Sequence, residues 1–180
     1  MNEPHPLWSL RPEFEGDLGE DRVPEDFLAR FERRVRDGLF EPGNRVRADY
    51  RVIASHRGEL SFAAGDFLTA YNIGLNEVEL RRAGDGTLSY HVRFARWARY
   101  VRIHGALLGA GLAAMHLVPA VRAQIDARPG GEWLFWPLLV LWSAIFPWVL
   151  IGIHGTFARR ALERILRSEL GEAATERRAA

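Results

Sequence analysis

The sequence predicts an α+β soluble domain, one helix on a small antiparallel sheet, followed by a two-helix transmembrane hairpin. Three observations support this prediction. Apolar and polar side chains alternate through much of residues 45–94, which is the period of strands with one buried face. Two apolar segments, 103–121 and 133–153, are each close to the roughly 20 residues that cross a bilayer. Arginine is concentrated on both sides of this pair of segments and is sparse between them.

The composition excludes several classes of protein. The chain has 180 residues, 24 basic and 23 acidic side chains, and no cysteine, so disulfides, thiol catalysis and Cys-ligated metal sites are excluded. The acidic, proline-rich N-terminus lacks the basic-then-apolar order of a secretory signal. We therefore expect the soluble domain to stay in the cytosol.

The N-terminal half is predicted to contain two regions. Residues 1–22 are acidic and rich in proline, and they are expected to form a flexible arm. Residues 23–98 are expected to form the cytosolic α+β domain, and residues 20–96 are expected to fold without the hairpin. The domain helix begins near Pro24, which a first helical turn tolerates. Apolar side chains follow at helical spacing, at Phe27, Leu28, Phe31 and Val35.

The alternating region predicts four antiparallel strands, with an arginine-rich outer face. The run Ala83–Gly86 is typical of a hairpin turn. Glu77 and Glu79 lie two residues apart on one strand face and are expected to pair with arginine across the sheet. Asn72 and Asn76 flank a glycine, which indicates a turn. No nucleophile elbow or ordered triad occurs in this region, so we expect no catalytic residue.

The hairpin is predicted to occupy residues 99–157, with spans at about 101–121 and 133–155. The short connection makes the two spans antiparallel neighbours, and the positive-inside rule places both termini in the cytoplasm. The segment 158–180 is predicted to be an amphipathic helix and tail, lying either along the inner leaflet or against the soluble domain. Residues assigned to the membrane interfaces are Arg99, Arg102, Arg159 and Arg160 on the inner side and Trp133 and Trp136 on the outer side.

A repeated Ile-His-Gly tripeptide provides the candidate ligand or switch residues. Antiparallel spans would bring His104 and His154 to the same depth near the cytoplasmic surface. Two facing imidazoles could hold a ligand or form a proton-sensitive pair, and separate structural roles at the interface are the alternative. A haem between them is not favoured, because a tight hairpin lacks the clearance. We therefore expect no cofactor and no metal.

Small residues and one further histidine occur at regular places in the first span. Gly105, Gly109 and Ala113 repeat every four residues, which favours close helix packing within the hairpin or in a homodimer. His116 lies deeper in the span, where a hydrogen bond to a neighbouring helix is expected.

Three short patterns in the hairpin carry a resemblance. Tyr100 and His104 open the first span, Trp133–Leu139 opens the second, and Ile153–His154 closes it. Over about residues 96–160 the chain resembles the two-transmembrane (2TM) domain family, a bacterial module. The resemblance implies a membrane anchor or sensor segment, sometimes joined to signalling domains, and it implies no catalytic residue.

Together these features predict a non-enzymatic protein of the bacterial inner membrane whose cytosolic domain binds a protein or a small ligand. Its role would be that of a sensor, an anchor or an accessory protein. One alternative is an accessory subunit of a larger membrane transport complex, and another is a lipid-binding or lipid-handling protein. The expected partners are the lipid bilayer and either a second copy or a larger membrane complex, with no nucleic acid.

Overall fold

The chain divides into two compact units in the computed structural model. The sheet unit comprises residues 1–97 and 154–180, and the helical unit comprises residues 98–153. The residues that the structure describes are 12–18, 23–38, 48–72 and 75–179.

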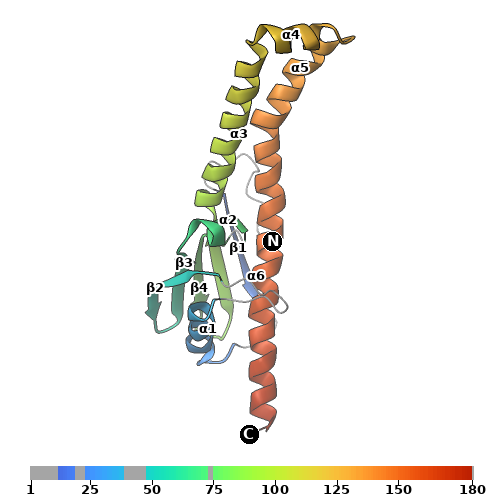
Figure 1. Ribbon diagram of the computed structural model, residues 1–180. Coiled ribbons are helices and arrows are strands. Elements are labelled where there is room, and N and C mark those ends of the chain that lie inside the picture. Colours follow the sequence, from blue (N-terminus) through green and yellow to red (C-terminus); the bar gives the residue numbers. More distant parts are fainter. Residues whose placement is uncertain (1–11, 19–22, 39–47, 73–74, 180) are drawn as a thin grey trace. The chain divides into compact units, whose positions relative to one another are not determined.

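One antiparallel sheet organises the sheet unit (Figure 1). The strand order is β1-β5-β4-β3-β2, so β2 to β5 form a meander and β1 joins its far edge. This confirms the antiparallel sheet of the predicted α+β domain, but the sheet has five strands rather than four. The strands are β1 (Glu13–Leu18), β2 (Tyr50–His56), β3 (Glu59–Ala64), β4 (Glu77–Arg82) and β5 (Leu88–Arg93).

The additional strand, β1, lies within the segment for which the sequence predicted a flexible arm. Leu18 is buried and Phe14 packs against the core, whereas Glu15 and Asp17 are exposed. The acidic side chains that suggested disorder therefore occupy only the solvent side of a strand of period two. The expectation of a flexible arm does not hold for residues 13–18.

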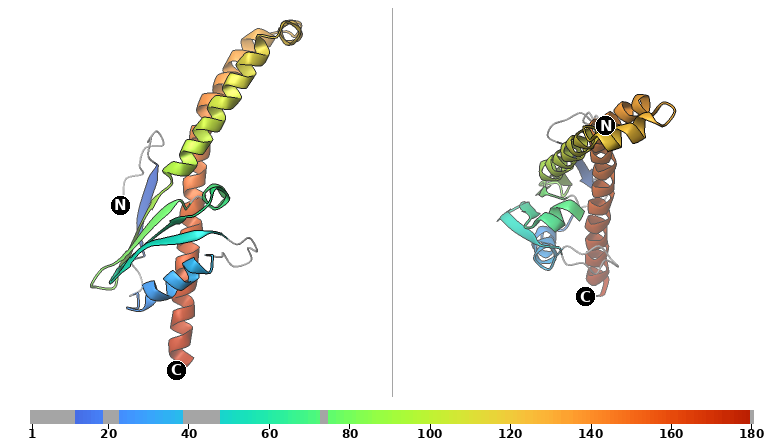
Figure 2. Two further views of the ribbon diagram at one scale, coloured as in Figure 1. Left: turned by 60° about the vertical axis from the view of Figure 1, so that its left-hand side comes forward. Right: turned by 45° about the horizontal axis from the view of Figure 1, so that its top comes forward.

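Helix α1 (Phe27–Arg36) covers one face of the sheet, as the apolar spacing of the sequence predicts (Figure 2). Phe27 and Phe31 are completely buried and stack on each other with ring centroids 5.8 Å apart. Phe31 also contacts the ring of Phe62 on β3, with centroids 6.1 Å apart. The helix thus contributes aromatic side chains to the centre of the core.

The C-terminal part of α6 (Phe146–Ala179) belongs to the same core. Leu162, Ile165 and Leu166 are at most 2% exposed and join the cluster formed by α1 and the sheet. The sequence left two locations open for the segment after residue 157, and the structure shows it packed against the sheet. An ion pair of 2.8 Å between Arg34 of α1 and the buried Glu169 of α6 adds a polar contact to this seam.

Asn76 connects three elements at one end of the sheet. Its side chain donates to the carbonyl oxygen of Ala70 in α2 (Phe67–Asn72) over 3.0 Å and accepts the backbone N–H of Trp97 over 2.7 Å. Its carbonyl oxygen accepts the N–H of Ala64. Asn76 is only 2% exposed. Asn76 is therefore a buried link that satisfies one of the first N–H groups of a helix, and the turn predicted around Gly74 lies outside the described residues.

The helical unit is built from consecutive helices. The continuous helix Gly131–Gly171 is long and apolar enough, by length and composition, to cross a membrane. The first predicted span meets the same criteria only as a pair of helices bent by 87°. The elements that contribute to this unit are α3 (Ala95–His116), α4 (Pro119–Asp126), α5 (Gly131–Val140), the π-helical segment η1 (Leu141–Ile145) and the beginning of α6.

The bend shortens the first predicted span. Helix α3 ends at His116, five residues before the predicted end, and Val118 is extended with φ −78° and ψ 118°. The cause is Pro119, which disfavours helical geometry in the residue before it and starts a new helix well. Part of the connection that the sequence treats as a loop is therefore the helix α4.

Candidate functional site

The face of the sheet opposite α1 and α6 carries polar side chains on four neighbouring strands. We call this surface the open face. Antiparallel register aligns its residues in rows across the strands, with His91 between Glu15 and Glu79 in the central row. The open face comprises Glu13, Glu15 and Asp17 of β1; Ser89, His91 and Arg93 of β5; Glu77, Glu79 and Arg81 of β4; and Glu59 and Ser61 of β3.

Cross-strand ion pairs occupy part of the open face. Arg93 pairs with Glu77 over 3.6 Å and also with Glu79, which confirms the expected pairing of these carboxylates with arginine. Arg81 pairs with Glu59 over 3.4 Å. Such exposed pairs contribute only about 0–1 kcal/mol each, so the charges are poorly explained as a device for stability.

The balance of charge on the open face differs from the sequence expectation. On the described strands, six carboxylates face this side but only three guanidinium groups, those of Arg51 on β2, Arg81 and Arg93. The prediction of an arginine-rich face is therefore wrong. The prediction counted the arginines of residues 45–94 and did not include β1, whose outward residues are all acidic.

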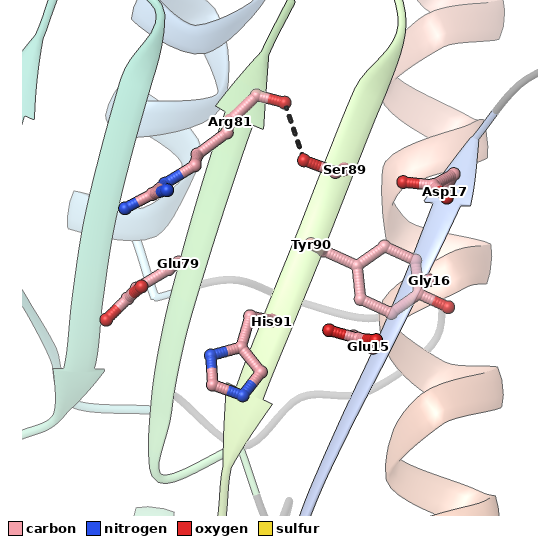
Figure 3. A pocket seen from close by; sticks show the side chains of 8 residues that line it. All are labelled: Glu15, Gly16, Asp17, Glu79, Arg81, Ser89, Tyr90 and His91. Atoms are coloured by element: carbon pink, nitrogen blue, oxygen red, sulfur yellow. Dashed lines mark hydrogen bonds between the residues drawn. The ribbon is translucent and has the colours of Figure 1, made fainter. Parts of the chain in front are cut away.

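A hollow of about 470 Å³ lies in the middle of the open face (Figure 3). Glu15 and Asp17 border it from the edge strand, and His91 and Ser89 lie between them and β4 (Figure 3). Ser89 donates a hydrogen bond of 3.3 Å to the carbonyl oxygen of Arg81. The lining thus combines carboxylate acceptors with an imidazole, a hydroxyl and one guanidinium group. The full lining is Glu15, Gly16, Asp17, Glu79, Arg81, Ser89, Tyr90 and His91.

A second hollow continues the open face towards the start of α3. Its volume is about 480 Å³, and it shares His91 with the first hollow. Here His91 lies 3.2 Å from Glu13, and Arg93 and Arg96 also border the space. The two hollows therefore form neighbouring polar depressions centred on β5.

The side chain of Tyr90 points to the covered side of the sheet, like those of Leu88 and Val92, and contacts α6. Its hydroxyl donates to Glu163 Oε1 over 2.5 Å, and Arg159 Nε donates to the same oxygen over 3.0 Å. Burial and the bond to Glu163 raise the pKa of Tyr90 to about 12. Burial opposes the charge on Glu163, but the hydrogen bonds from Tyr90 and Arg159 hold the pKa of this carboxyl below its usual value. Glu163 is therefore a charged acceptor at neutral pH.

Gly16 makes this contact possible. A Cβ at this position would lie 2.3 Å from the hydroxyl of Tyr90, which is closer than real side chains approach. The glycine directly opposite Tyr90 in the ladder therefore leaves the space through which the phenol reaches α6.

The two histidines of the repeated tripeptide lie in different units. His154 belongs to the sheet unit and stacks on Trp97 with centroids 3.9 Å apart and planes 8° apart. Beside it, Gly155 gives space to Phe94. His104 belongs to the helical unit and is exposed on α3. The pairing of His104 with His154 stays a prediction.

The small residues of α3 have a definite environment in the helical unit. A Cβ on Gly105 would lie 2.5 Å from Pro147 Cγ and 2.8 Å from the carbonyl oxygen of Ser143. A Cβ on Gly109 would lie 2.5 Å from Ser143 Cβ. Both glycines therefore lie against the helix formed by η1 and the start of α6, whereas Ala113 is only half-buried.

The remaining residues singled out from the sequence lie mostly at the surface of their own unit. Trp133 is 77% and Trp136 47% exposed. The guanidinium of Arg102 lies 4.5 Å from the centre of the Trp148 ring. The exposed basic residues are Arg99, Arg159 and Arg160.

His116 packs among aromatic rings rather than forming the expected interhelical hydrogen bond. Its ring stacks on Phe135 with centroids 4.5 Å apart and meets Trp136 edge-on at 5.3 Å. Within the described part of the chain, its Nδ1 has no hydrogen-bond partner. Aromatic packing thus explains its burial at the end of α3.

Sequence reasoning identified the region that forms β3, β4 and β5 of the open face, but neither β1 nor the residues at the centre of the face. His91 and Asp17 were not singled out, because β1 was not recognised as a strand and a lone histidine in an alternating segment carries no signal. Among the described residues, no three His, Asp or Glu side chains are arranged to hold a metal ion. No protein-family model, curated protein or solved structure matches the chain.

Proposed function

We propose that the protein is a two-pass inner-membrane anchor that presents the open face in the cytoplasm as a binding surface for a cationic partner. The observation that carries this proposal is that one continuous helix contains both an apolar segment and residues of the domain core. Residues 133–153 contain no ionisable side chain, and residues 158–166 complete the core of the sheet unit. An anchor that is part of the domain core leaves the opposite face of the sheet for binding.

The membrane part of the proposal predicts the location of both termini. Arginines at 93, 96, 99 and 102 precede the first apolar segment, and those at 159, 160, 164 and 167 follow the second. The connection holds only Arg122 and Arg128, and Arg122 is already paired with Asp126 over 3.8 Å. Positive charge resists translocation, so reporter fusions at Met1 and at Ala180 should both give a cytoplasmic signal.

Matched fusions distinguish a hairpin from a single span. A reporter inserted after Arg128, in the connection, should give the opposite, periplasmic signal. If the reporters at the two termini lay on opposite sides of the membrane, the chain would cross it an odd number of times, and the two-pass anchor would be wrong.

The partner is assigned by charge. Glu15 and Asp17 add two carboxylates to a surface whose arginines already have acidic neighbours across the sheet. A cationic segment of a protein, carrying arginine or lysine, complements this surface and would gain charge-assisted hydrogen bonds in the hollow. The same charge disfavours nucleic acid. The hollows are lined mainly by charged and polar side chains, which gives no support to the lipid-handling alternative.

A neutralisation experiment tests the binding surface. The variant E15Q/D17N keeps the size of both side chains and removes their charge, and E25Q/D26N does the same on the exposed start of α1. We expect an arginine-rich peptide to bind the purified wild-type protein and the E25Q/D26N protein alike, and to bind E15Q/D17N about tenfold more weakly, which corresponds to about 1.4 kcal/mol. Fluorescence anisotropy of the labelled peptide measures the affinities. Equal affinity for both variants would exclude the open face as the site.

A further inference from the structure

The short helix α2 exposes two large apolar side chains at one end of the sheet. Leu68 is 64% exposed and Phe67 is 50% exposed. They are adjacent, so they form one small apolar surface. On the other side of the helix Thr69 and Ala70 are buried, with Ala70 completely inaccessible. Helix α2 is therefore amphipathic, with an apolar outer side that faces away from the core.

The apolar side is held in place by a defined cap. The backbone N–H of Thr69 donates to Asp66 Oδ1 over 2.6 Å, and Thr69 Oγ1 accepts the N–H of Asp49 over 2.9 Å. The hydrogen bonds from Thr69 hold the pKa of Asp66 below its usual value, so the cap is charged at neutral pH. The cap and the buried Ala70 fix the direction in which Phe67 and Leu68 point.

Strand register places α2 at the end of the sheet where α3 begins. In the ladder, Ala63 lies opposite Glu77, and Glu77 lies opposite Arg93. The chain leaves β3 to form α2 and leaves β5 to form α3, so both helices start at this same end. Asn76 joins them directly, because it bonds to Ala70 of α2 and to Trp97 in the first turn of α3.

The first turn of α3 is also the approach to the first predicted span. Trp97 precedes the start of that span by four residues, and Arg99 and Arg102 lie at the level assigned to the headgroups. Arg96 donates to the carbonyl oxygen of Ala64 over 2.9 Å, next to α2. Arg51, whose side chain is 75% exposed, is close enough to help lower the pKa of Asp66. Exposed guanidinium groups thus accompany the apolar side of α2.

We propose that Phe67 and Leu68 insert into the interface of the inner leaflet and fix the sheet unit against the membrane. The occupant of this apolar surface is phospholipid, with Arg51 and Arg96 directed to the phosphates. Two side chains form too small a surface for a stable protein interface, but they match the shallow burial of an interfacial helix. This inference rests on the proposed membrane anchor and adds a second, peripheral attachment to it.

The absence of cysteine allows a direct test by site-specific labelling. The variants L68C, L107C and R57C each receive an environment-sensitive fluorophore in the full chain, reconstituted in vesicles of phosphatidylcholine and phosphatidylglycerol. Leu107 is 68% exposed on α3, within the first predicted span, and Arg57 is exposed in the β2–β3 turn at the opposite end of the sheet from α2. All three side chains are exposed, so labelling leaves the core intact. Doxyl quenchers are placed either near the lipid headgroup or near the chain end.

The three positions give distinguishable results. We expect the L68C label to have blue-shifted emission and to be quenched at least twofold more by the headgroup doxyl than by the chain-end doxyl. The L107C label should respond more to the chain-end doxyl, and the R57C label to neither. If L68C behaved as R57C while L107C was quenched, the interfacial contact would be wrong and the anchor would stand. If no position was quenched, the anchor would be wrong, and the inference would be wrong with it.

Discussion

Deletion of residues 154–180 is expected to unfold the sheet unit. Leu162, Ile165 and Leu166 are almost completely buried in the common core, and truncation of one such side chain costs about 2–5 kcal/mol. Domains of this size are stable by about 5–15 kcal/mol in total, so the loss of all three side chains removes most or all of the stability. The deletion also leaves Arg34 and Tyr90 without their partners on α6. Residues 12–97 alone should therefore lack a cooperative transition in denaturant, followed by circular dichroism.

A rejoined chain provides the control. Residues 12–97 connected by a flexible linker to residues 154–171 contain every described element of the sheet unit and should unfold cooperatively. The fragment 20–96, which the sequence suggested would fold alone, lacks both β1 and α6 and should not fold. Should residues 12–97 prove as stable as the rejoined chain, to within about 0.5 kcal/mol, α6 would be a dispensable cover rather than part of the core.

Replacement of Gly105 by alanine is expected to destabilise the helical unit, whereas the same change at Gly111 should stabilise it. In a helix interior, alanine is favoured over glycine by about 1 kcal/mol. At Gly111 a Cβ meets nothing within 4 Å, so only this gain applies. At Gly105 the Cβ would meet the ring of Pro147 at 2.5 Å and a backbone oxygen at 2.8 Å, and overpacking of this kind costs about 1–3 kcal/mol.

The two alanine variants should therefore shift the midpoint of thermal unfolding in opposite directions. The measurement is the loss of helical circular dichroism in the detergent-solubilised full chain. G109A should resemble G105A, because its Cβ would meet Ser143 at 2.5 Å. A stabilising shift for G105A equal to that for G111A would mean that α3 does not approach the second helix closely at this position.

Patterns among neighbouring residues correctly predicted several strands and the helix α1. The alternation around Leu60–Ala64 and Leu88–Val92 and the helical spacing of Phe27 and Phe31 are properties of neighbouring residues, and the corresponding elements are present. The break at Pro119 also had a local signal, which the apolar character of residues 117–121 obscured. Long-range contacts had no such signal in the sequence. Arg34 and Glu169 are separated by 135 residues, and nothing near either residue indicates the other.

The candidate site depended still more on tertiary structure. The open face becomes a surface of aligned acidic and basic rows only when β1 is placed beside β5, and β1 was hidden in an acidic segment. Asn76 follows Gly74, which suggested turn chemistry, so its burial could not be read from its neighbours. The repeated Ile-His-Gly drew attention to His154, but its environment is defined by the ring of Trp97, which lies 57 residues earlier in the chain.

The π-helical segment η1 has a geometric consequence for the long helix that contains it. A π turn accommodates one more residue than an α turn, so it offsets the azimuth of everything that follows by about 100°. A helical wheel drawn in a single phase through the part of this helix in the helical unit would therefore place the residues after Ile145 on the wrong side. The contact of Pro147 with Gly105 of α3, within the helical unit, therefore depends on η1, and a deletion within η1 would rotate Pro147 away from α3.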